Sequence, residues 1–308
     1  MAQIVLEAEG VTKRYGRVPA LDRFSARFEE GKIYGLLGRN GAGKTTLLNI
    51  LTSRAFASSG TVRAFGEPAV ENPRVLPKIC YMAEKNLFDR HMKVKSILKA
   101  AAQFYDGYDA EFAHALCERF ALDTGKPYKA LSRGYESILR IVIGLASRCP
   151  VTIFDEPVLG LDAAVREDFY RALIEDFAQN PRTYILSTHM IEESADIFDE
   201  AVIIRAGRLV EQTSTEALKA GSFTVSGKTE AVEQAVRELR VVHRETLAGV
   251  TAASVYDPES APRARRELAA AGLELSGVPV QKLFIYLTDR AGEPAGKTSA
   301  KGDASWNA

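Results

Sequence analysis

One glycine-rich run constrains this chain more than any other feature. Residues 38–46 read GRNGAGKTT and fill the phosphate-binding pattern G-x-x-x-x-G-K-[ST] without a mismatch. An apolar segment suited to a buried strand (33–37) precedes the run, and a helix-compatible segment (46–51) follows it. Strand, glycine loop and helix occur in the order that a phosphate-binding loop requires, so the sequence predicts that the chain binds a nucleoside triphosphate.

Each residue type in this loop suits a phosphate. Glycines let backbone N–H groups turn inward, and the following helix presents the positive end of its dipole. Lys44 supplies a mobile positive charge, and the Thr45 hydroxyl can ligate Mg²⁺. The predicted nucleotide-binding residues of the loop are Gly38, Arg39, Asn40, Gly41, Ala42, Gly43, Lys44, Thr45 and Thr46.

A second candidate site follows a later apolar strand, where residues 151–154 lead into Asp155 and Glu156. The carboxyl ends of parallel strands line the ligand crevice of an open α/β sheet. Asp155 can therefore reach Mg²⁺, and Glu156 can orient and deprotonate an attacking water. Taken alone, such a strand end could equally be a surface turn, but the glycine loop in the same chain favours a catalytic role.

Residues 183–188 repeat this design and lead into His189. A lone histidine is more often structural than functional. Its position at the end of a third strand of the same predicted sheet favours a role in the site.

Residues 131–135, Leu-Ser-Arg-Gly-Tyr, lie between the glycine loop and the Asp-Glu strand. This segment resembles the Leu-Ser-Gly-Gly-Gln signature of the nucleotide-binding subunits of ABC transporters. Ser132 and Gly134 match that motif, whereas Arg133 and Tyr135 replace its first Gly and its Gln. Arg133 could add a charge to the phosphate site of a partner subunit, or it could be a solvated residue.

Three further segments extend the resemblance. Residues 155–162, which end at Asp162, are similar to the fused Walker B motif and D-loop of the family. His189 resembles its switch histidine, and Tyr15 resembles the aromatic residue that stacks on adenine. These motifs occur in the family's order.

The resemblance implies an α/β fold, a P-loop NTPase ABC cassette with a mixed-sheet core, an antiparallel β-subdomain and a helical subdomain. It also implies ATP and Mg²⁺ as cofactors. In the family, two cassettes pair head to tail and hold each ATP between the phosphate loop of one and the signature of the other. Ser132 and Gly134 would then contact ATP bound by a second cassette, either a copy of this chain or a close homologue.

The resemblance also implies the individual roles. Glu156 would be the general base, and His189 would sense or stabilise the γ-phosphate. Lys44, Thr45 and Asp155 would hold phosphate and metal. Outside the glycine loop, the implied nucleotide-binding residues are Tyr15, Glu84, Ser132, Arg133, Gly134 and Asp162.

Glu84 stands where the family usually has the Gln of its Q-loop. A carboxylate cannot replace the donor of a carboxamide, and it adds negative charge near Mg²⁺ and phosphate. Some bacterial exporter cassettes also carry Glu here. We expect Glu84 at the metal together with Thr45 and Asp155; the alternative is that it points into solvent.

Composition favours a subunit that needs a membrane partner. The 40 Lys plus Arg residues balance 40 Asp plus Glu residues, so we expect no nucleic-acid partner. The longest apolar stretches, such as 138–146, are shorter than the ~18 to 20 residues of a membrane span, and no secretory signal precedes the first predicted strand. Cys80, Cys117 and Cys149 have no metal-ligand spacing and indicate buried thiols. We expect a cytoplasmic protein, peripheral on the inner face of the cell membrane and bound to an integral membrane permease.

The character of the sequence changes after Gly221. We assign residues 1–221 to the ABC cassette and 222–289 to a small C-terminal α+β domain with the ferredoxin-like order β-α-β-β-α-β. Residues 290–308 are rich in Gly, Ala, Ser and Lys, which predicts a disordered tail. The small domain could stabilise a dimer, regulate the cassette or have a purely structural role.

Three classes of function compete. We favour an ATP hydrolase that powers a separate permease, an exporter, because a short single cassette with a small C-terminal module and Glu84 resembles exporter subunits. The second class is a soluble ABC protein acting on ribosomes or DNA, but those carry two cassettes or long coiled coils, and this sequence has neither pattern. The third is a regulatory ATP-binding module without turnover, and Asp155, Glu156 and His189 argue against it.

Overall fold

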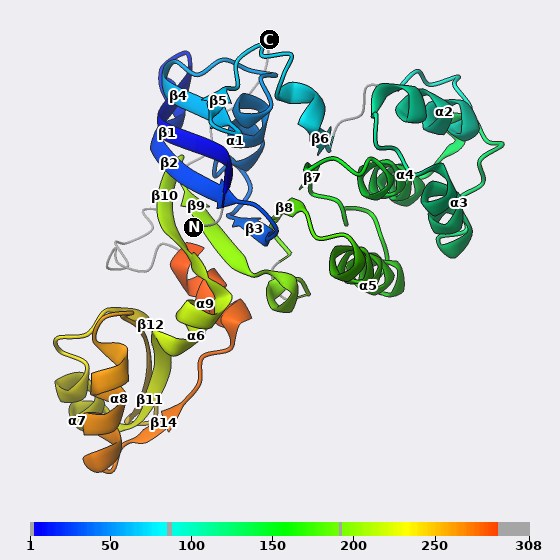
Figure 1. The fold of residues 1–308 in the computed structure, drawn as a ribbon. Coiled ribbons are helices and arrows are strands. Elements are labelled where there is room, and N and C mark those ends of the chain that lie inside the picture. The colour runs from blue at the N-terminus through cyan, green and yellow to red at the C-terminus, as the bar shows by residue number, and fades with distance from the viewer. Residues whose placement is uncertain (1–2, 85–87, 191–192, 289–308) are drawn as a thin grey trace, which may run out of the picture.

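Apolar runs of the sequence form most strands of the main six-stranded sheet, whose order is β10-β9-β3-β8-β7-β6 (Figure 1). The structure is a computed structural model, and it describes residues 3–84, 88–190 and 193–288. The sheet strands are β3 (Ile33–Leu37), β6 (Ile79–Met82), β7 (Val151–Asp155), β8 (Thr183–Thr188), β9 (Glu200–Arg205) and β10 (Arg208–Ser214). All pairs are parallel except β9 with β10. Strands β3, β6, β7 and β8 are buried along their whole length, which explains why they read as continuous apolar runs.

Helices connect these strands and bring the motifs to one edge of the sheet. Helix α1 (Lys44–Leu51) follows the glycine loop, α4 (Arg133–Ala146) begins in the signature segment, and α5 (Ala163–Gln179) follows residues 155–162. Ser132 and Asp162 are the N-caps of α4 and α5, and their side chains accept hydrogen bonds from the amides of Tyr135 and Val165. Both motif residues therefore also have a structural role, because they fix where a helix starts.

An antiparallel sheet with the order β2-β1-β4-β5 packs beside the main sheet. Its strands are β1 (Ile4–Tyr15), β2 (Val18–Glu29), β4 (Ser59–Ala64) and β5 (Glu67–Pro68). In β2 the buried residues Phe24, Ala26 and Phe28 alternate with more exposed ones, as the period-two pattern predicts. This sheet shares a hydrophobic core with α1 and with one side of the main sheet.

Helices α2 (Val94–Phe104) and α3 (Ala110–Arg119) lie with α4 on the opposite side of the main sheet from the antiparallel sheet (Figure 1). They form the helical part of the cassette. The described residues of the cassette also include three short 3₁₀ helices, η1 (Leu76–Lys78), η2 (Tyr128–Ala130) and η3 (Ala195–Ile197).

After α6 (Thr215–Ala220), the chain forms a small second sheet-and-helix unit, which Figure 1 shows at the bottom of the molecule. Its elements are β11 (Ser222–Lys228), α7 (Thr229–Ala235), β12 (Val241–Leu247), β13 (Val250–Tyr256), α8 (Ala261–Ala270) and β14 (Glu274–Ser276). The strand order β12-β13-β11-β14 is antiparallel throughout. This is the ferredoxin-like arrangement that the β-α-β-β-α-β order predicts.

The sequence analysis predicted no element between residues 278 and 289, yet the structure has a helix there, α9 (Val280–Thr288). Its side chains Leu283, Phe284 and Leu287 are buried in the same core as residues of β9 and α6. The chain thus returns from the small unit to the cassette. Residues 290–308, predicted to be a disordered tail, lie outside the described residues.

Candidate nucleotide-binding site

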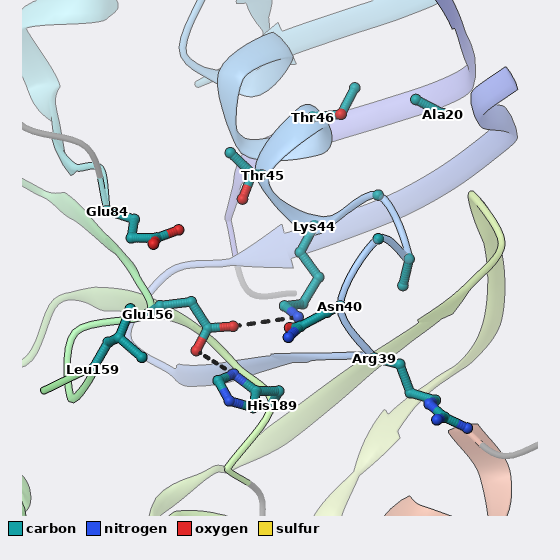
Figure 2. A pocket seen from close by; sticks show the side chains of 13 residues that line it. Ala20, Arg39, Asn40, Lys44, Thr45, Thr46, Glu84, Glu156, Leu159 and His189 are labelled. Carbon is teal, nitrogen blue, oxygen red and sulfur yellow. Dashed lines mark hydrogen bonds and ion pairs between the residues drawn. The ribbon is translucent and has the colours of Figure 1, made fainter. Parts of the chain in front are cut away.

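A pocket of about 440 Å³ opens at the carboxyl ends of β3, β7 and β8 (Figure 2). The residues that line it come from the glycine loop and from the segments that follow β6, β7 and β8, together with one residue of β2. They are Ala20, Arg39, Asn40, Gly41, Ala42, Gly43, Lys44, Thr45, Thr46, Glu84, Glu156, Leu159 and His189. Most of the predicted site residues are therefore brought together, whereas Ala20 and Leu159 were not predicted.

The glycine loop needs its glycines for steric reasons. Gly41 and Gly43 have φ angles of 79° and 111°, which residues with a side chain rarely adopt. A Cβ atom on Gly43 would lie 2.6 Å from the carbonyl oxygen of Ala20, and one on Gly38 would lie 2.5 Å from that of Ile204. At Gly38 and Gly43 the loop therefore packs too closely against neighbouring main chain to carry a side chain.

Lys44 is buried beneath this loop, with 5% of its surface exposed. Its ammonium group donates a hydrogen bond to the carbonyl oxygen of Gly38 at 2.7 Å. It also lies 3.3 Å from Oε1 of Glu156, so the cation of the loop forms an ion pair with the carboxylate that follows β7.

Glu156 is held from two sides (Figure 2). Its Oε2 lies 2.8 Å from Nδ1 of His189, while Oε1 faces Lys44. The residue has a φ angle of 51°, and its amide donates to the carbonyl oxygen of Ser187 at 3.0 Å. Left-handed backbone is costly for a residue with a side chain, and it clusters at functional sites where the surrounding structure maintains it.

Asp155 is almost fully buried and accepts three hydrogen bonds. The Thr45 hydroxyl donates to Oδ2 at 2.8 Å, Ser187 donates to Oδ1 at 2.7 Å, and the Tyr81 phenol donates to Oδ2 at 3.3 Å. Burial, together with the Asp155 charge, raises the pKa of Tyr81 well above its usual range, so the phenol keeps its proton and remains a donor. The sequence analysis assigned no role to Tyr81 or Ser187 at this carboxylate.

Comparison with known proteins identifies the fold and the family. The ABC transporter family matches residues 21–159. The bacitracin transport ATP-binding protein BcrA of Enterococcus faecalis is 31% identical over 219 residues, which cover 70% of this chain and 71% of BcrA. The chain belongs to the ABC transporter ATP-binding proteins. The prediction of an ABC-type ATPase subunit is thus confirmed.

Two other relatives differ in how far the similarity extends. The ABC transporter ATP-binding protein YtrB of Bacillus subtilis (strain 168) is 31% identical over 61% of this chain and 65% of its own length. The daunorubicin resistance ATP-binding protein DrrA3 of Streptomyces coeruleorubidus is 29% identical over 94% of this chain and 97% of its own. The DrrA3 match therefore includes the unit formed by β11 to β14.

Solved structures of cassettes share the fold. An ATP-binding subunit of an ABC transporter superposes with a TM-score of 0.63 at 23% identity, over 70% of this chain and 92% of that chain. A dimeric post-hydrolysis cassette, MJ0796 bound to ADP and Pi, gives a TM-score of 0.60 at 19% identity, over 68% of this chain and 98% of that one. The predicted α/β cassette fold is confirmed. No helix within the described ranges has the length and apolar character that crossing a membrane requires.

The side chains around Asp155 suit Mg²⁺ when nucleotide is bound to the cassette. Thr45 and Asp155 offer oxygen atoms, which this hard cation prefers, and Mg²⁺ bound with nucleotide usually takes only one or two protein ligands beside phosphate oxygens and water. Among the described residues, no group of three His, Cys, Asp or Glu side chains could hold a metal by itself. Glu84 lines the same pocket and is exposed, so its carboxylate is accessible from the nucleotide side.

The signature residues are absent from the lining of this pocket. Ser132 and Arg133 are exposed at the start of α4, where a second cassette could reach them. Gly134 packs against the D-loop, because a Cβ atom on it would lie 2.8 Å from the carbonyl oxygen of Gly160. Asp162 is likewise outside the pocket lining and caps α5.

Tyr15 also lies outside the pocket lining. The residue is 58% exposed at the end of β1, and the Lys13 ammonium lies 5.1 Å from its ring centroid. The ring is available to a ligand but is not held in place by buried neighbours.

Proposed function

We propose that this chain binds and hydrolyses ATP and so powers a separate integral membrane permease of an exporter. The observation that carries the proposal is the continuous contact from Lys44 through Glu156 to His189 beside the phosphate loop. A regulatory module that only binds nucleotide has no need for a carboxylate held between a cation and a histidine at the γ-phosphate end of the pocket.

The geometry supports Glu156 as general base. Its carboxylate can accept a proton from a water molecule, and the nearby His189 ring fixes its orientation. Lys44 faces Glu156 here, and a phosphate in the loop would offer it a second anionic partner. Asp155 and Thr45 would hold Mg²⁺, which supplies charge neutralisation between phosphate oxygens when bound.

We infer that two cassettes assemble head to tail, with Ser132, Arg133 and Gly134 of one chain facing the ATP of the other. The exposure of Ser132 and Arg133 and the presence of Leu159, from the segment before Asp162, in the pocket lining support this arrangement. Tyr15 would stack on adenine, Asp162 would lie at the subunit boundary, and Glu84 would approach the metal. The second cassette is a copy of this chain or a close homologue.

The names of the relatives support an exporter. BcrA is a bacitracin transport protein, DrrA3 is a daunorubicin resistance protein, and another relative, of Ralstonia nicotianae, is a Nod factor export protein. We infer that the cassette lies in the cytoplasm on the inner face of the cell membrane. We also propose that it contacts no nucleic acid, since its charges balance.

We keep residues 1–221 as the cassette and 222–289 as an accessory domain. The antiparallel sheet β12-β13-β11-β14 has a hydrophobic core of its own, which supports this division, and its residues Val242 and Tyr256 also pack into the core of the cassette. Helix α9 joins the two units, because it packs on the cassette although it follows the accessory sheet.

Substitution of the base tests the proposal. Glu156→Gln keeps a side chain that can position water but cannot accept its proton, so turnover should fall by about 10² to 10⁴. Glu118→Gln, at an exposed position of α3, is the matched control and should hydrolyse ATP normally. Normal hydrolysis by Glu156→Gln would remove Glu156 as the base.

The same variant tests the dimer. ATP that is bound but not hydrolysed should hold two cassettes together, so light scattering after size exclusion should show Glu156→Gln shifting from monomer to dimer with ATP. Adding Ser132→Arg should cancel the shift by placing a bulky cation at the γ-phosphate. An inactive variant that remains monomeric with saturating ATP would leave the catalytic role standing and count against the shared ATP site.

A further inference from the structure

Arg140 is a buried cation that the roles described so far do not use. It lies in α4, about two turns after the helix begins at Arg133, with 6% of its surface exposed. Its Nη1 donates to the carbonyl oxygens of Ala83 at 2.8 Å and Glu84 at 2.7 Å, and its Nη2 donates to Oγ of Ser137 at 2.7 Å. The Arg140 guanidinium thus links α4 to the main chain at Ala83 and Glu84.

Ser137 extends this contact to a second loop. Its side chain is buried, and its hydroxyl donates to the carbonyl oxygen of Leu159 at 2.8 Å. Leu159 lines the nucleotide pocket three residues after Glu156, whose carbonyl oxygen accepts a hydrogen bond from the Leu159 amide at 3.3 Å. The next residue, Gly160, touches Gly134 at the start of α4. Two segments that contribute to the nucleotide pocket, one at Glu84 and one at Leu159, are therefore attached to a single helix.

The chemistry of Arg140 fits this linking role better than a stabilising role. Its hydrogen-bond partners among the described residues are carbonyl and hydroxyl oxygens, and a buried cation without a directly bonded carboxylate is costly. A planar guanidinium can reach several oxygen atoms at once in fixed directions, which a lysine cannot. An aliphatic residue would fill the same space without the cost of burying a charge.

We propose that Arg140 is a positioning residue for ATP hydrolysis: it binds the main chain at Glu84 and, through Ser137, the main chain at Leu159, so that the Q-loop, the D-loop and the signature helix move together. The proposal rests on the ATPase function proposed above. Because the signature end of α4 would face the nucleotide of the second cassette, Arg140 links the two nucleotide sites of the dimer.

Three substitutions test the role. Arg140→Met keeps most of the side-chain volume but removes every donor, Arg140→Lys keeps the charge on a single nitrogen, and Ser137→Ala removes only the link to Leu159. Arg171→Met is the matched control, because Arg171 is exposed on α5 and pairs with Glu167. Each purified full-length variant is assayed for folding by circular dichroism, for ATP affinity by calorimetry, for turnover, and for backbone hydrogen exchange by mass spectrometry.

Arg140→Met should reduce kcat by about 10- to 100-fold, since loops displaced by an ångström misplace reacting groups. Its ATP affinity should stay within about twofold, because the phosphate loop is untouched. Arg140→Lys should lose less turnover than Arg140→Met, because it keeps the charge and one donor nitrogen. Exchange should accelerate in residues 79–84 and 156–161 of Arg140→Met, but only in 156–161 of Ser137→Ala. If Arg140→Met does not fold, the exchange patterns of Arg140→Lys and Ser137→Ala test the same links to residues 79–84 and 156–161.

Turnover equal to that of the control in a folded Arg140→Met protein would overturn the proposal. A loss of turnover in Arg140→Met that is fully explained by weaker ATP binding or by lower stability would overturn it too. So would hydrogen exchange at residues 79–84 that is unchanged in both Arg140 variants. If the wild-type protein does not hydrolyse ATP, the proposed function fails instead, and the exchange patterns still decide whether Arg140 holds the two loops.

Discussion

The ammonium group of Lys44 lies 3.3 Å from the Glu156 carboxylate, and about nine-tenths of each side chain is buried. The cation of the loop and the proposed base therefore form a buried ion pair. We propose that a γ-phosphate in the loop would attract Lys44 and release Glu156 from this pair, so that binding and activation of the base would be coupled through one side chain.

Replacing Lys44 by Ala should weaken ATP binding by about 10- to 100-fold, because charge-assisted hydrogen bonds to phosphate are lost. Calorimetric titration measures this directly. Lys99→Ala, an exposed position on α2, is the control and should bind ATP normally. Unchanged affinity in Lys44→Ala would show that the loop holds phosphate by its main chain alone.

Glu84→Gln should leave ATP affinity nearly intact and shift the Mg²⁺ and Mn²⁺ dependence of hydrolysis, because it removes one negative charge from the pocket that contains Thr45. The comparison is between metal titrations of the two proteins, with Glu111→Gln on α3 as control. Superimposable curves for wild type and Glu84→Gln would place Glu84 outside the metal's surroundings.

Gly134→Ala should separate the signature helix from the D-loop, since the added methyl would lie 2.8 Å from the carbonyl oxygen of Gly160. Overpacking of this kind typically costs about 1–3 kcal/mol. We expect reduced turnover and reduced ATP-dependent dimerisation with ATP binding by the monomer retained. A variant with normal turnover would mean that this contact is loose enough to adjust.

Asp109 gives a prediction about pH. Hydrogen bonding from the Phe112 amide and then from Arg148 lowers the pKa of Asp109, so the native state favours its carboxylate form. This contribution to stability is present above the pKa of unfolded aspartate, about 3.9, and is lost as pH falls through the lower native value. Urea unfolding of wild type and Asp109→Asn should differ by about 0.5–1 kcal/mol at pH 7.

That difference should shrink as pH falls below about 4, because Asp109 of the unfolded chain takes up a proton there while the native carboxylate does so only at a lower pH. A difference that stays constant from pH 7 to pH 3 would show that the charge of Asp109 does not cause the effect of Asp109→Asn.

Phe284→Ala in α9 should destabilise the cassette, because this fully buried ring belongs to the same core as Leu218 and Ile203. Loss of a buried phenylalanine costs about 3–5 kcal/mol. Urea unfolding followed by circular dichroism measures the change, and Leu247→Ala, at a largely exposed site of β12, is the control. If Phe284→Ala leaves the urea unfolding of the cassette unchanged, α9 does not contribute to the stability of the cassette.

The sequence predicted the pocket residues that follow the parallel strands, because motif order and strand ends place Lys44, Asp155, Glu156 and His189 near one another whatever the exact packing. It could not predict the partners of Asp155. The bonds from Tyr81 and Ser187 depend on the register between neighbouring strands, in which Asp155 lies beside Ser187 and Phe154 beside Met82.

The sequence did not predict the contacts of Arg140 or the helix α9, and the reasons differ. In the sequence, Arg140 is one cation in a helix that is apolar along much of its length. The carbonyl oxygens of Ala83 and Glu84 that it binds come from a distant segment, and only Ser137 is a neighbour in the same helix. Residues 280–288, VQKLFIYLT, contain several residues with a preference for strands, so local propensity competes with the helix. Packing on the cassette decides the outcome, and only the tertiary structure contains that information.

Helix α9 also sets the timing of assembly during synthesis. The cassette surface on β9 and α6 is complete in sequence by residue 221, yet the helix that covers it ends at residue 288. At a translation rate of about 5–20 residues per second, the ribosome needs roughly 3 to 13 seconds to make the intervening residues. During this interval the apolar surface of a nascent cassette has no α9 to cover it, and the residues of the accessory sheet are made before those of α9.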